Sequence, residues 1–199
     1  MIALFALLGC GGATATIAPV GEVGVATEDA PARPFRRMNI DQLAASIEAV
    51  SGVAWTERED EEDVRLFDTL SGSLGKPDYL SSTHEELSPG LLFQKFLDDA
   101  AKDVCTTWAE AERSRPAAER TLLVHVEPDD TLAGNPDGVA ANVAAALLRF
   151  HGHVVDPADA AVEPWSLLFA RGAEATGDPV GGWKLVCVGL FTHPDFYTF

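Results

Sequence analysis

Two short segments of the chain come close to known catalytic motifs, and each lacks a residue that the chemistry requires. Residues 84–88 read HEELS and begin like the His-Glu-x-x-His zinc motif, but Ser88 stands where the second histidine must be. Residues 71–75 read SGSLG and are similar to the turn that presents a nucleophilic serine. Ser71 replaces the first glycine of that turn, and no strand is expected before it. We therefore do not expect Ser73 to act as a nucleophile.

Two histidines lie close together at residues 151–153, which read His-Gly-His. They fall at the expected C-terminal end of a helix. The helix dipole favours a cation there, so an imidazolium at this place has a structural explanation. A metal site would need two more ligands, and the sequence does not identify them. We therefore expect no metal at His151 and His153.

A short acidic cluster contains Asp129 and Asp130, with Glu127 nearby. A calcium loop needs several oxygen ligands at fixed spacing, so we interpret this cluster as a turn with capping carboxylates. His125 stands alone in an apolar run and is expected to be an ordinary core or edge histidine. We expect no catalytic residue. An enzyme with a site assembled from distant residues would have these as its first candidates: His125, Asp129, Asp130, His151 and His153.

The length and charge of the chain exclude some classes of function. It has 199 residues and a formal net charge of −17. Sequence-independent binding to nucleic acid and adhesion to anionic lipid headgroups both require clustered Lys and Arg. We therefore expect no nucleic-acid partner and no membrane binding through the surface of the domain. Residues 35–199 are enough for one domain with a hydrophobic core.

The first ten residues indicate where the protein works. Residues 2–8 are apolar, and Leu7-Leu8-Gly9-Cys10 resembles the lipobox of bacterial lipoproteins. This resemblance implies cleavage before Cys10, diacylglycerol on its sulfur and an acylated amino group. No Lys or Arg precedes Cys10 and the apolar stretch is short for a signal peptide, so a buried N-terminal strand or helix is the alternative.

The lipobox hypothesis divides the chain into three parts. Residues 1–9 are then a signal segment, and residues 10–34 hold the lipidated Cys10 and a flexible linker rich in Gly, Ala, Thr, Val and Pro. Residues 35–199 form the helical domain. The protein would belong to the cell envelope, on the outer or inner membrane, facing the periplasm or the surface. Its lipid would be its only contact with the membrane, since no other run of 18 apolar residues is present.

Most of residues 35–199 show helical periodicity, with capping residues at the expected helix starts. We predict an all-α single domain of five or six amphipathic helices. The expected helices cover residues 39–51, 63–70, 88–114 and 135–151, and two more begin at residues 163 and 178, the last ending at Pro194.

Three other segments of the domain carry separate expectations. The acidic block at residues 57–63 is expected to be a solvated turn or the start of a helix, with a cation site as the alternative. Residues 121–126 are strand-like, but they could equally form a helical turn or an extended crossing segment, because a lone strand has no ladder partner. The aromatic tail at residues 195–199 is expected to pack against the domain.

Two cysteines remain beside Cys10. Cys105 lies next to the apolar stripe of one expected helix and Cys187 lies within that of another, so both are expected to face inwards. An even pair of cysteines in an exported protein favours a disulfide between them. The alternative is two buried free thiols that pack as small apolar side chains.

Three segments of the domain resemble cytochrome-c-associated domains of unknown function, which occur in exported and often lipid-anchored bacterial proteins. They are a helix opening at residues 36–43, residues 148–152, and the closing segment 183–197 with its Pro-Asp-Phe ending. The resemblance transfers no catalytic residue. Members with haem carry a Cys-x-x-Cys-His motif, which this chain lacks, so we expect no haem and no other cofactor.

These observations favour a non-enzymatic protein of the cell envelope with a binding or scaffolding role, beside a redox or secreted protein partner. The alternative is an envelope enzyme or metal-binding protein with a site assembled from distant His and Asp residues. A third hypothesis is ligand binding between helices. It would use aromatic residues whose helical spacing is more typical of a core: Trp108, Trp165, Trp183 and Phe191.

Overall fold

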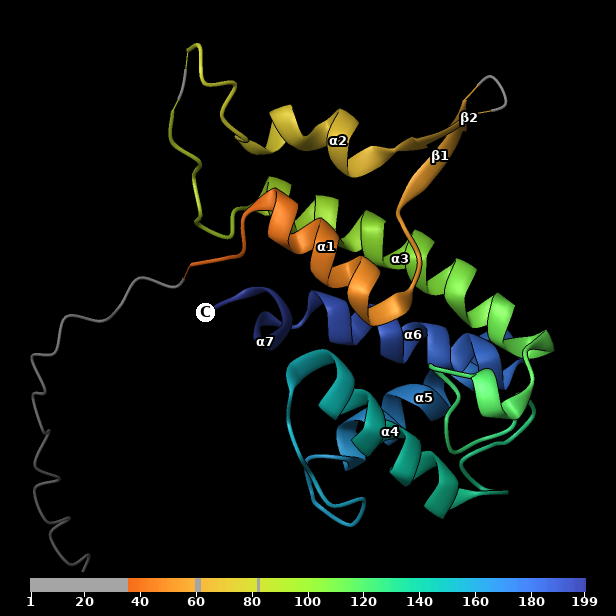
Figure 1. Cartoon of the computed structure of the whole chain (residues 1–199). Coiled ribbons are helices and arrows are strands. Elements are labelled where there is room, and N and C mark those ends of the chain that lie inside the picture. Colours follow the sequence, from red (N-terminus) through yellow and green to blue (C-terminus); the bar gives the residue numbers. More distant parts are fainter. Residues whose placement is uncertain (1–35, 60–61, 82) are drawn as a thin grey trace, which may run out of the picture. The chain divides into compact units, whose positions relative to one another are not determined.

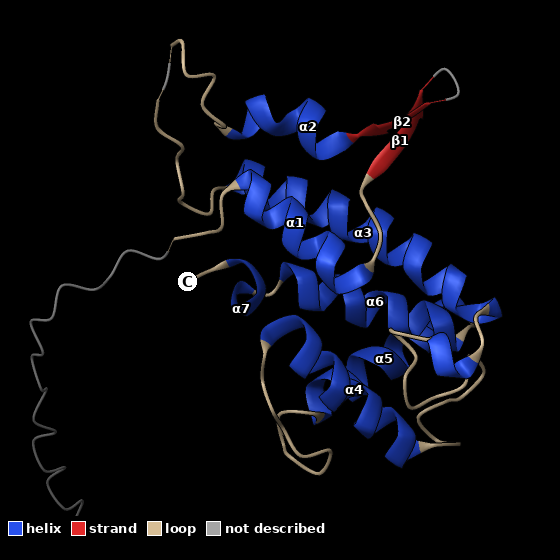
Figure 2. Cartoon of the chain, viewed as in Figure 1, coloured by secondary structure: helices blue, strands red, loops and turns tan. Residues whose placement is uncertain are grey.

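The computed structural model describes residues 36–59, 62–81 and 83–199 (Figure 1). The expected signal segment at residues 1–9, the linker at residues 10–34 and Cys10 lie outside the described residues. Within the described residues, seven α-helices and one two-stranded sheet are present, so the predicted all-α class is confirmed (Figure 2). Five of these helices have 12 residues or more and agree with the predicted long helices.

The first helix, α1 (Ile40–Ser51), has the boundaries that the sequence predicts. Asn39 caps its N-terminus, and Asn39 and Gln42 exchange hydrogen bonds in a capping box. Gly52 ends the helix with φ 71°, a left-handed conformation that an L side chain rarely adopts. The buried side of α1 presents Ile40, Leu43 and Ile47 to the core.

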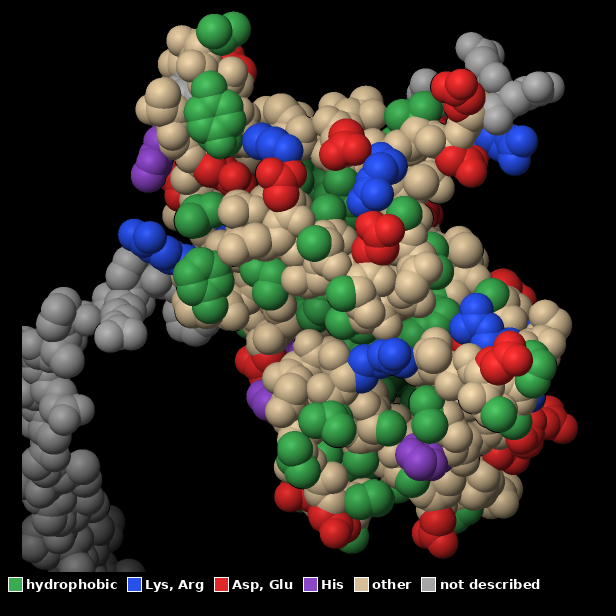
Figure 3. Space-filling model, viewed as in Figure 1, with side chains coloured by type: hydrophobic (Ala, Val, Ile, Leu, Met, Phe, Trp, Pro, Cys, Tyr) green, Lys and Arg blue, Asp and Glu red, His purple; other side chains and the backbone are tan. Residues whose placement is uncertain are grey.

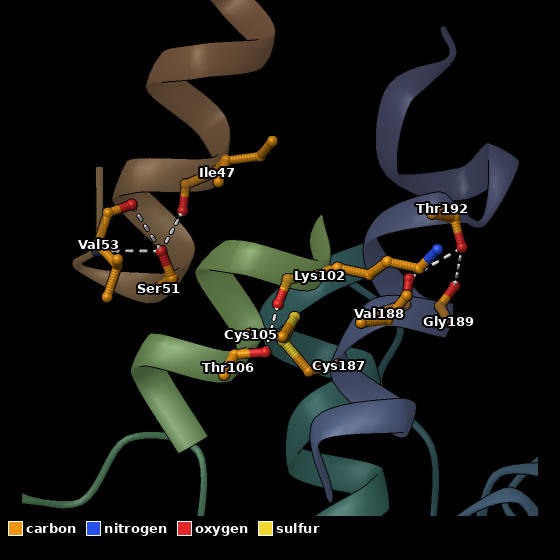
Figure 4. Close-up of a disulfide and its surroundings, with 10 residues drawn as sticks. All are labelled: Ile47, Ser51, Val53, Lys102, Cys105, Thr106, Cys187, Val188, Gly189 and Thr192. Carbon is orange, nitrogen blue, oxygen red and sulfur yellow. Dashed lines mark hydrogen bonds between the residues drawn. A yellow bond between two sulfur atoms is a disulfide. The ribbon is translucent and has the colours of Figure 1, made fainter. Parts of the chain in front are cut away.

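The centre of the domain is a pair of long helices, α3 (Leu91–Ser114) and α6 (Pro179–Thr192), which lie side by side (Figure 1). A disulfide joins Cys105 of α3 to Cys187 of α6, with their Cα atoms 5.9 Å apart (Figure 4). Both cysteines are completely buried, which confirms the predicted inward orientation and the predicted bond. The cross-link therefore fixes the two central helices at their common face.

The next helix, α5 (Glu163–Thr176), packs closely on α6. A methyl group at Gly182 would lie 2.5 Å from the carbonyl oxygen of Phe169, so only glycine allows this approach. Phe169 and Trp183 pack together across the same contact, with ring centroids 4.5 Å apart and ring planes tilted by 31°. Asp178 caps α6 as expected, because its side chain accepts the N–H of Val180.

The helix α4 (Pro136–His151) and the short helix α7 (Pro194–Tyr197) complete the C-terminal half. Asn135 caps α4, and Gly152 ends it with φ 70°. The C-terminal tail returns to the start of the domain, where the Met38 N–H donates to the Tyr197 carbonyl at 2.7 Å. Phe196 and Tyr197 are buried as predicted for the tail, whereas Phe199 is exposed.

The described part of the acidic block lies in a pair of strands that the sequence did not predict, and residues 60–61 between the strands lie outside the described residues. Strand β1 (Thr56–Glu59) pairs antiparallel with β2 (Glu62–Arg65), and Figure 2 shows this hairpin extending away from the helices. Trp55 and Phe67 flank the hairpin and pack together in the core, with ring centroids 5.3 Å apart. The contact between Trp55 and Phe67 brings Thr56 of β1 next to Arg65 of β2, so the two strands can pair.

Two helix boundaries in this region also differ from the prediction. The short helix expected from residue 63 is α2 (Leu66–Leu70), because the preceding residues belong to β2, and a 3-10 helix follows it at Ser71–Leu74. The helix α3 begins at Leu91 and not at Ser88. The Gly90 N–H donates to the Ser88 carbonyl at 2.9 Å, so a tight turn separates the serine from the helix.

The strand-like residues 121–126 form an irregular, bent segment, and not a strand, a helical turn or an extended chain. Side chains from two helices accept the backbone N–H groups of this segment, as a neighbouring strand would in a sheet. The buried carboxylate of Glu112 accepts the N–H groups of residues 121–123 at 2.9–3.1 Å. The amide oxygen of Asn142 accepts those of Val124 and His125 at 2.8 and 3.0 Å. A helix on either side thus supplies the partners that a sheet would otherwise provide.

No helix in the described part of the chain is both long enough and apolar enough to cross a bilayer.

Candidate functional site

Three side chains gather where α4 ends and where α6 meets α7. His151 is the last residue of α4, His193 joins α6 to α7, and Asp195 lies in the first turn of α7. One nitrogen or oxygen atom from each lies within 4.8 Å of those of the other two. Among the residues that the structure describes, this is the one group of three His, Cys, Asp or Glu side chains with such spacing.

His151 is partly buried and is held by the backbone of α6. Its Nε2 lies 3.0 Å from the carbonyl oxygen of Leu190, which can only accept, so Nε2 carries a proton and donates. Burial lowers the pKa of His151, against the opposing effect of this hydrogen bond. In the neutral ring the proton is then on Nε2 and the lone pair is on Nδ1.

His193 and Asp195 are joined through the start of α7. The Nδ1 atom of His193 accepts the backbone N–H of Asp195 at 3.2 Å, which caps this short helix. The same Nδ1 lies 3.6 Å from the carboxylate oxygen Oδ2 of Asp195. These two side chains are 42% and 44% exposed, so solvent and small ions can reach them.

Two further side chains border the group. The Nε2 atom of His153 lies 3.8 Å from Oδ2 of Asp195, and its ring centroid is 5.7 Å from that of His151. The partly buried indole of Trp165, on α5, lies 6.2 Å from the ring of His151 and 6.0 Å from that of His193. Two imidazoles and a carboxylate therefore lie together, with His153 next to the carboxylate and the indole of Trp165 next to both imidazoles.

This arrangement matches the ligands that borderline divalent metals take in proteins. Imidazole nitrogen suits Zn²⁺, Cu²⁺ and Ni²⁺, and a carboxylate often completes the set. Nothing in the group resembles a triad for nucleophilic catalysis, which needs an activated hydroxyl or thiol next to the histidine. The chemistry that these residues could support is therefore metal binding.

The remaining candidates from the sequence do not join this group. The Asp130 carboxylate accepts the backbone N–H of Glu127 at 2.9 Å and the Asn135 amide at 2.8 Å, and these bonds lower its pKa. Asp130 thus organises the turn before α4. Asp129 and His125 lie near this turn and outside the group of three. Of the five candidates, His151 belongs to the group and His153 borders it, whereas His125 and Asp130 line a separate surface pocket.

Residues of the two incomplete catalytic motifs make hydrogen bonds or ion pairs that hold the local structure. The Ser73 hydroxyl donates to the Leu70 carbonyl at 2.6 Å within the 3-10 turn. In the HEELS segment, Glu85 pairs with the buried guanidinium of Arg37 at 3.0 Å. Arg37 also donates to the carbonyl of Glu86 at 2.6 Å, so it fastens this segment to the start of the domain.

The aromatic residues considered for ligand binding mostly belong to the core. Trp108, Trp183 and Phe191 are at most 1% exposed, and Trp165 is the member that reaches the surface. A surface groove of about 650 Å³ lies elsewhere, between the start of α6 and the loop before α4. Small and apolar residues dominate its lining, and nothing in the structure shows what would occupy it.

Sequence reasoning missed His193, Asp195 and the place of Trp165. Residues 193–195 read His-Pro-Asp, which the sequence analysis interprets as a helix end and the start of a tail and not as metal ligands. A pair of metal-type side chains beside this proline could have been matched with His151 and His153. Grouping these residues requires knowing that the C-terminal ends of α4 and α6 meet, and only the tertiary structure shows this.

Comparison with protein-family models, with curated proteins and with solved structures finds no match to this chain. The resemblance of residues 36–43, 148–152 and 183–197 to cytochrome-c-associated domains stays a prediction. The first of these segments has a structural role, through the capping box of α1 and the buried Arg37.

Proposed function

We propose that this protein is an exported module of the bacterial cell envelope, anchored by a lipid on Cys10, with a binding or scaffolding role. The observation that supports it best is the buried disulfide between Cys105 and Cys187. Disulfides persist in oxidising compartments such as the periplasm and are rare in the cytosol. Export through a lipobox would bring this chain to such a compartment.

The surface of the domain is consistent with this role. The formal charge of −17 disfavours direct binding to anionic headgroups and to nucleic acid. On the face seen in Figure 3, Lys and Arg side chains lie mostly beside acidic ones and form no continuous basic surface. A lipid would then keep the protein at the membrane, and the domain would remain available to a protein partner of the envelope.

Metabolic labelling tests the anchor. We expect an alkyne-bearing palmitate analogue to label the full-length wild-type protein, which then fractionates with membranes. Cys10→Ser should lose the label and move to the soluble fraction. The double variant Cys105→Ala/Cys187→Ala is the matched control, since it removes two cysteines and keeps Cys10. A Cys10→Ser protein that stays with membranes would refute the anchor.

The disulfide gives a second measurement of export. Non-reducing mass spectrometry of the protein from its native compartment should find the peptides of Cys105 and Cys187 linked. Two alkylatable thiols at these positions in the native protein would place it in a reducing compartment. This result would contradict the export proposal even if Cys10 proved inaccessible to labelling.

A further inference from the structure

We propose that His151, His193 and Asp195 bind one divalent transition metal ion, such as Zn²⁺ or Cu²⁺, with His153 as a fourth ligand. The proposal does not depend on the lipid anchor, because it concerns side chains that the domain itself brings together. It extends the alternative of a metal-binding site built from distant residues by identifying its members.

The distances fit a metal of this size. Ligand atoms about 2.1 Å from a tetrahedral zinc ion lie about 3.4 Å from one another. Nδ1 of His193 and Nε2 of His153 lie 3.6 and 3.8 Å from Oδ2 of Asp195. The ligand atoms of the three principal side chains lie within 4.8 Å of one another, so small side-chain rotations bring them to one ion.

The hydrogen bond on His151 is of the kind found at metal sites. A histidine ligand usually donates its second ring N–H to a carbonyl or carboxylate, which fixes the tautomer and the ring orientation. His151 donates from Nε2 to the Leu190 carbonyl, so its other nitrogen keeps a lone pair. His193 uses its Nδ1 lone pair to accept the Asp195 N–H at 3.2 Å, and a metal bound there would replace this single long hydrogen bond.

The ligands are also carried by fixed elements. His151 is the last residue of the 16-residue helix α4, and α6, which precedes His193, is bonded to α3 through Cys187. The hydrogen bond from His151 to the Leu190 carbonyl joins α4 directly to α6. A site whose ligands come from packed helix ends costs little ordering on binding. Trp165 lies on one side of the group and would report on the ion through its fluorescence.

The donor set selects a class of metal. Imidazole nitrogens suit Zn²⁺, Cu²⁺ and Ni²⁺, whereas Mg²⁺ and Ca²⁺ prefer shells of oxygen. The three side chains offer two imidazoles and one carboxylate, and His153 would add a third imidazole, so we expect Zn²⁺ and Cu²⁺ to bind and Mg²⁺ and Ca²⁺ not to compete. The site is surface-exposed, and an ion can enter from solvent.

Calorimetric titration of the metal-free full chain with ZnCl₂ tests this directly. The protein carries no histidine tag and has the background Cys10→Ser, which removes a thiol that could bind metal. We expect one Zn²⁺ per chain, unaffected by millimolar Mg²⁺ or Ca²⁺. His193→Asn and Asp195→Asn should each weaken binding by at least tenfold. Asn is a good helix cap, so His193→Asn preserves the start of α7.

Matched controls come from the two histidines outside the group. His84→Asn and His125→Asn should leave zinc affinity within twofold of the parent. Cu²⁺ should quench the fluorescence of Trp165 in the parent, and Trp165→Phe should remove most of this quenching without loss of zinc binding. The other three tryptophans are buried in the core and provide the residual signal.

Three outcomes would overturn the proposal. The parent protein could bind no Zn²⁺ or Cu²⁺ at concentrations up to about 1 mM. It could bind with an affinity that His193→Asn and Asp195→Asn change by less than twofold. It could lose binding equally in the His84→Asn and His125→Asn controls, which would indicate adventitious surface histidines. Thermal unfolding of each metal-free variant verifies that lost binding is not lost folding.

Discussion

Two groups of polar side chains in this domain, each assembled from distant residues, differ in how many of their polar atoms make hydrogen bonds within the protein. The group at Glu112 and Asn142 is buried, and its side chains bind the backbone of the bent segment at residues 121–126. The group at His151, His193 and Asp195 is partly exposed and retains lone pairs.

The difference separates structural polar residues from candidates for function. Glu112 receives three backbone N–H groups and pairs with Arg115 at 2.5 Å, so the fold accounts for it. The carboxylate of Asp195 instead lies next to the imidazoles of His153 and His193. A buried polar side chain whose hydrogen bonds are all made within the protein indicates a role in stability. Exposed side chains whose lone pairs point to one place indicate ligand binding.

The largest expected effect is in the buried group. Glu112→Gln should lower the free energy of unfolding by about 3 kcal/mol, because an amide accepts the three N–H groups less well and leaves Arg115 without its ion pair. Urea unfolding measures this loss. Glu110→Gln is the control on the same helix, since Glu110 pairs with Arg113 at an exposed position, and it should change stability by less than about 0.5 kcal/mol. Equal effects of the two variants would remove the distinction between the regions.

Asn142→Leu should cost about 2 kcal/mol, because it leaves the N–H groups of Val124 and His125 and the carbonyl of Leu122 without partners. Hydrogen exchange gives the sharper measurement. The amides of Val124 and His125 should exchange faster in the variant than amides in the middle of α3. Unchanged protection at both amides would show that Asn142 does not hold the segment.

The exposed group should behave in the opposite way. His193→Asn, measured without metal, should change the free energy of unfolding by less than about 1 kcal/mol, because Asn replaces the capping acceptor. Saturating Zn²⁺ should raise the melting temperature of the parent and have less effect on the variant. A loss of more than about 2 kcal/mol without metal would make His193 a structural residue like Glu112.

The smallest expected effect concerns an ion pair at the surface, whose side chains are neither fully buried nor fully exposed. Arg113 and the capping Asp178 are joined by hydrogen bonds, and this contact lowers the pKa of Asp178. A carboxyl with a lowered folded pKa stabilises the protein above its unfolded pKa of about 3.9, and this contribution disappears as pH falls through the lower folded value.

Asp178→Asn keeps a capping side chain and removes the charge. It should cost less than about 1 kcal/mol at pH 7, since Asp178 is 31% exposed. The difference from wild type should shrink below about pH 4 in a series of melting temperatures. Asp129→Asn serves as the control. A difference that grows toward acid would contradict the assignment of the stabilising charge to Asp178.

The sequence by itself determined much of the helical framework. Asn39, Asn135 and Asp178 mark the starts of α1, α4 and α6, and Gly52 and Gly152 mark the ends of two helices, because caps and left-handed glycines act within a few residues. The inward faces of Cys105 and Cys187 followed from helical periodicity, and their pairing from the even number of cysteines that remain beside Cys10.

Only the tertiary structure decided the rest. The hairpin at residues 56–65 depends on the packing of Trp55 against Phe67, and the path of residues 121–126 depends on Glu112 and Asn142 from two other helices. The metal-type group arises because the end of α4 meets the junction of α6 and α7. Local rules specify where a helix begins and which face it buries. They do not specify which helix ends meet, since that follows from how all the apolar faces pack together.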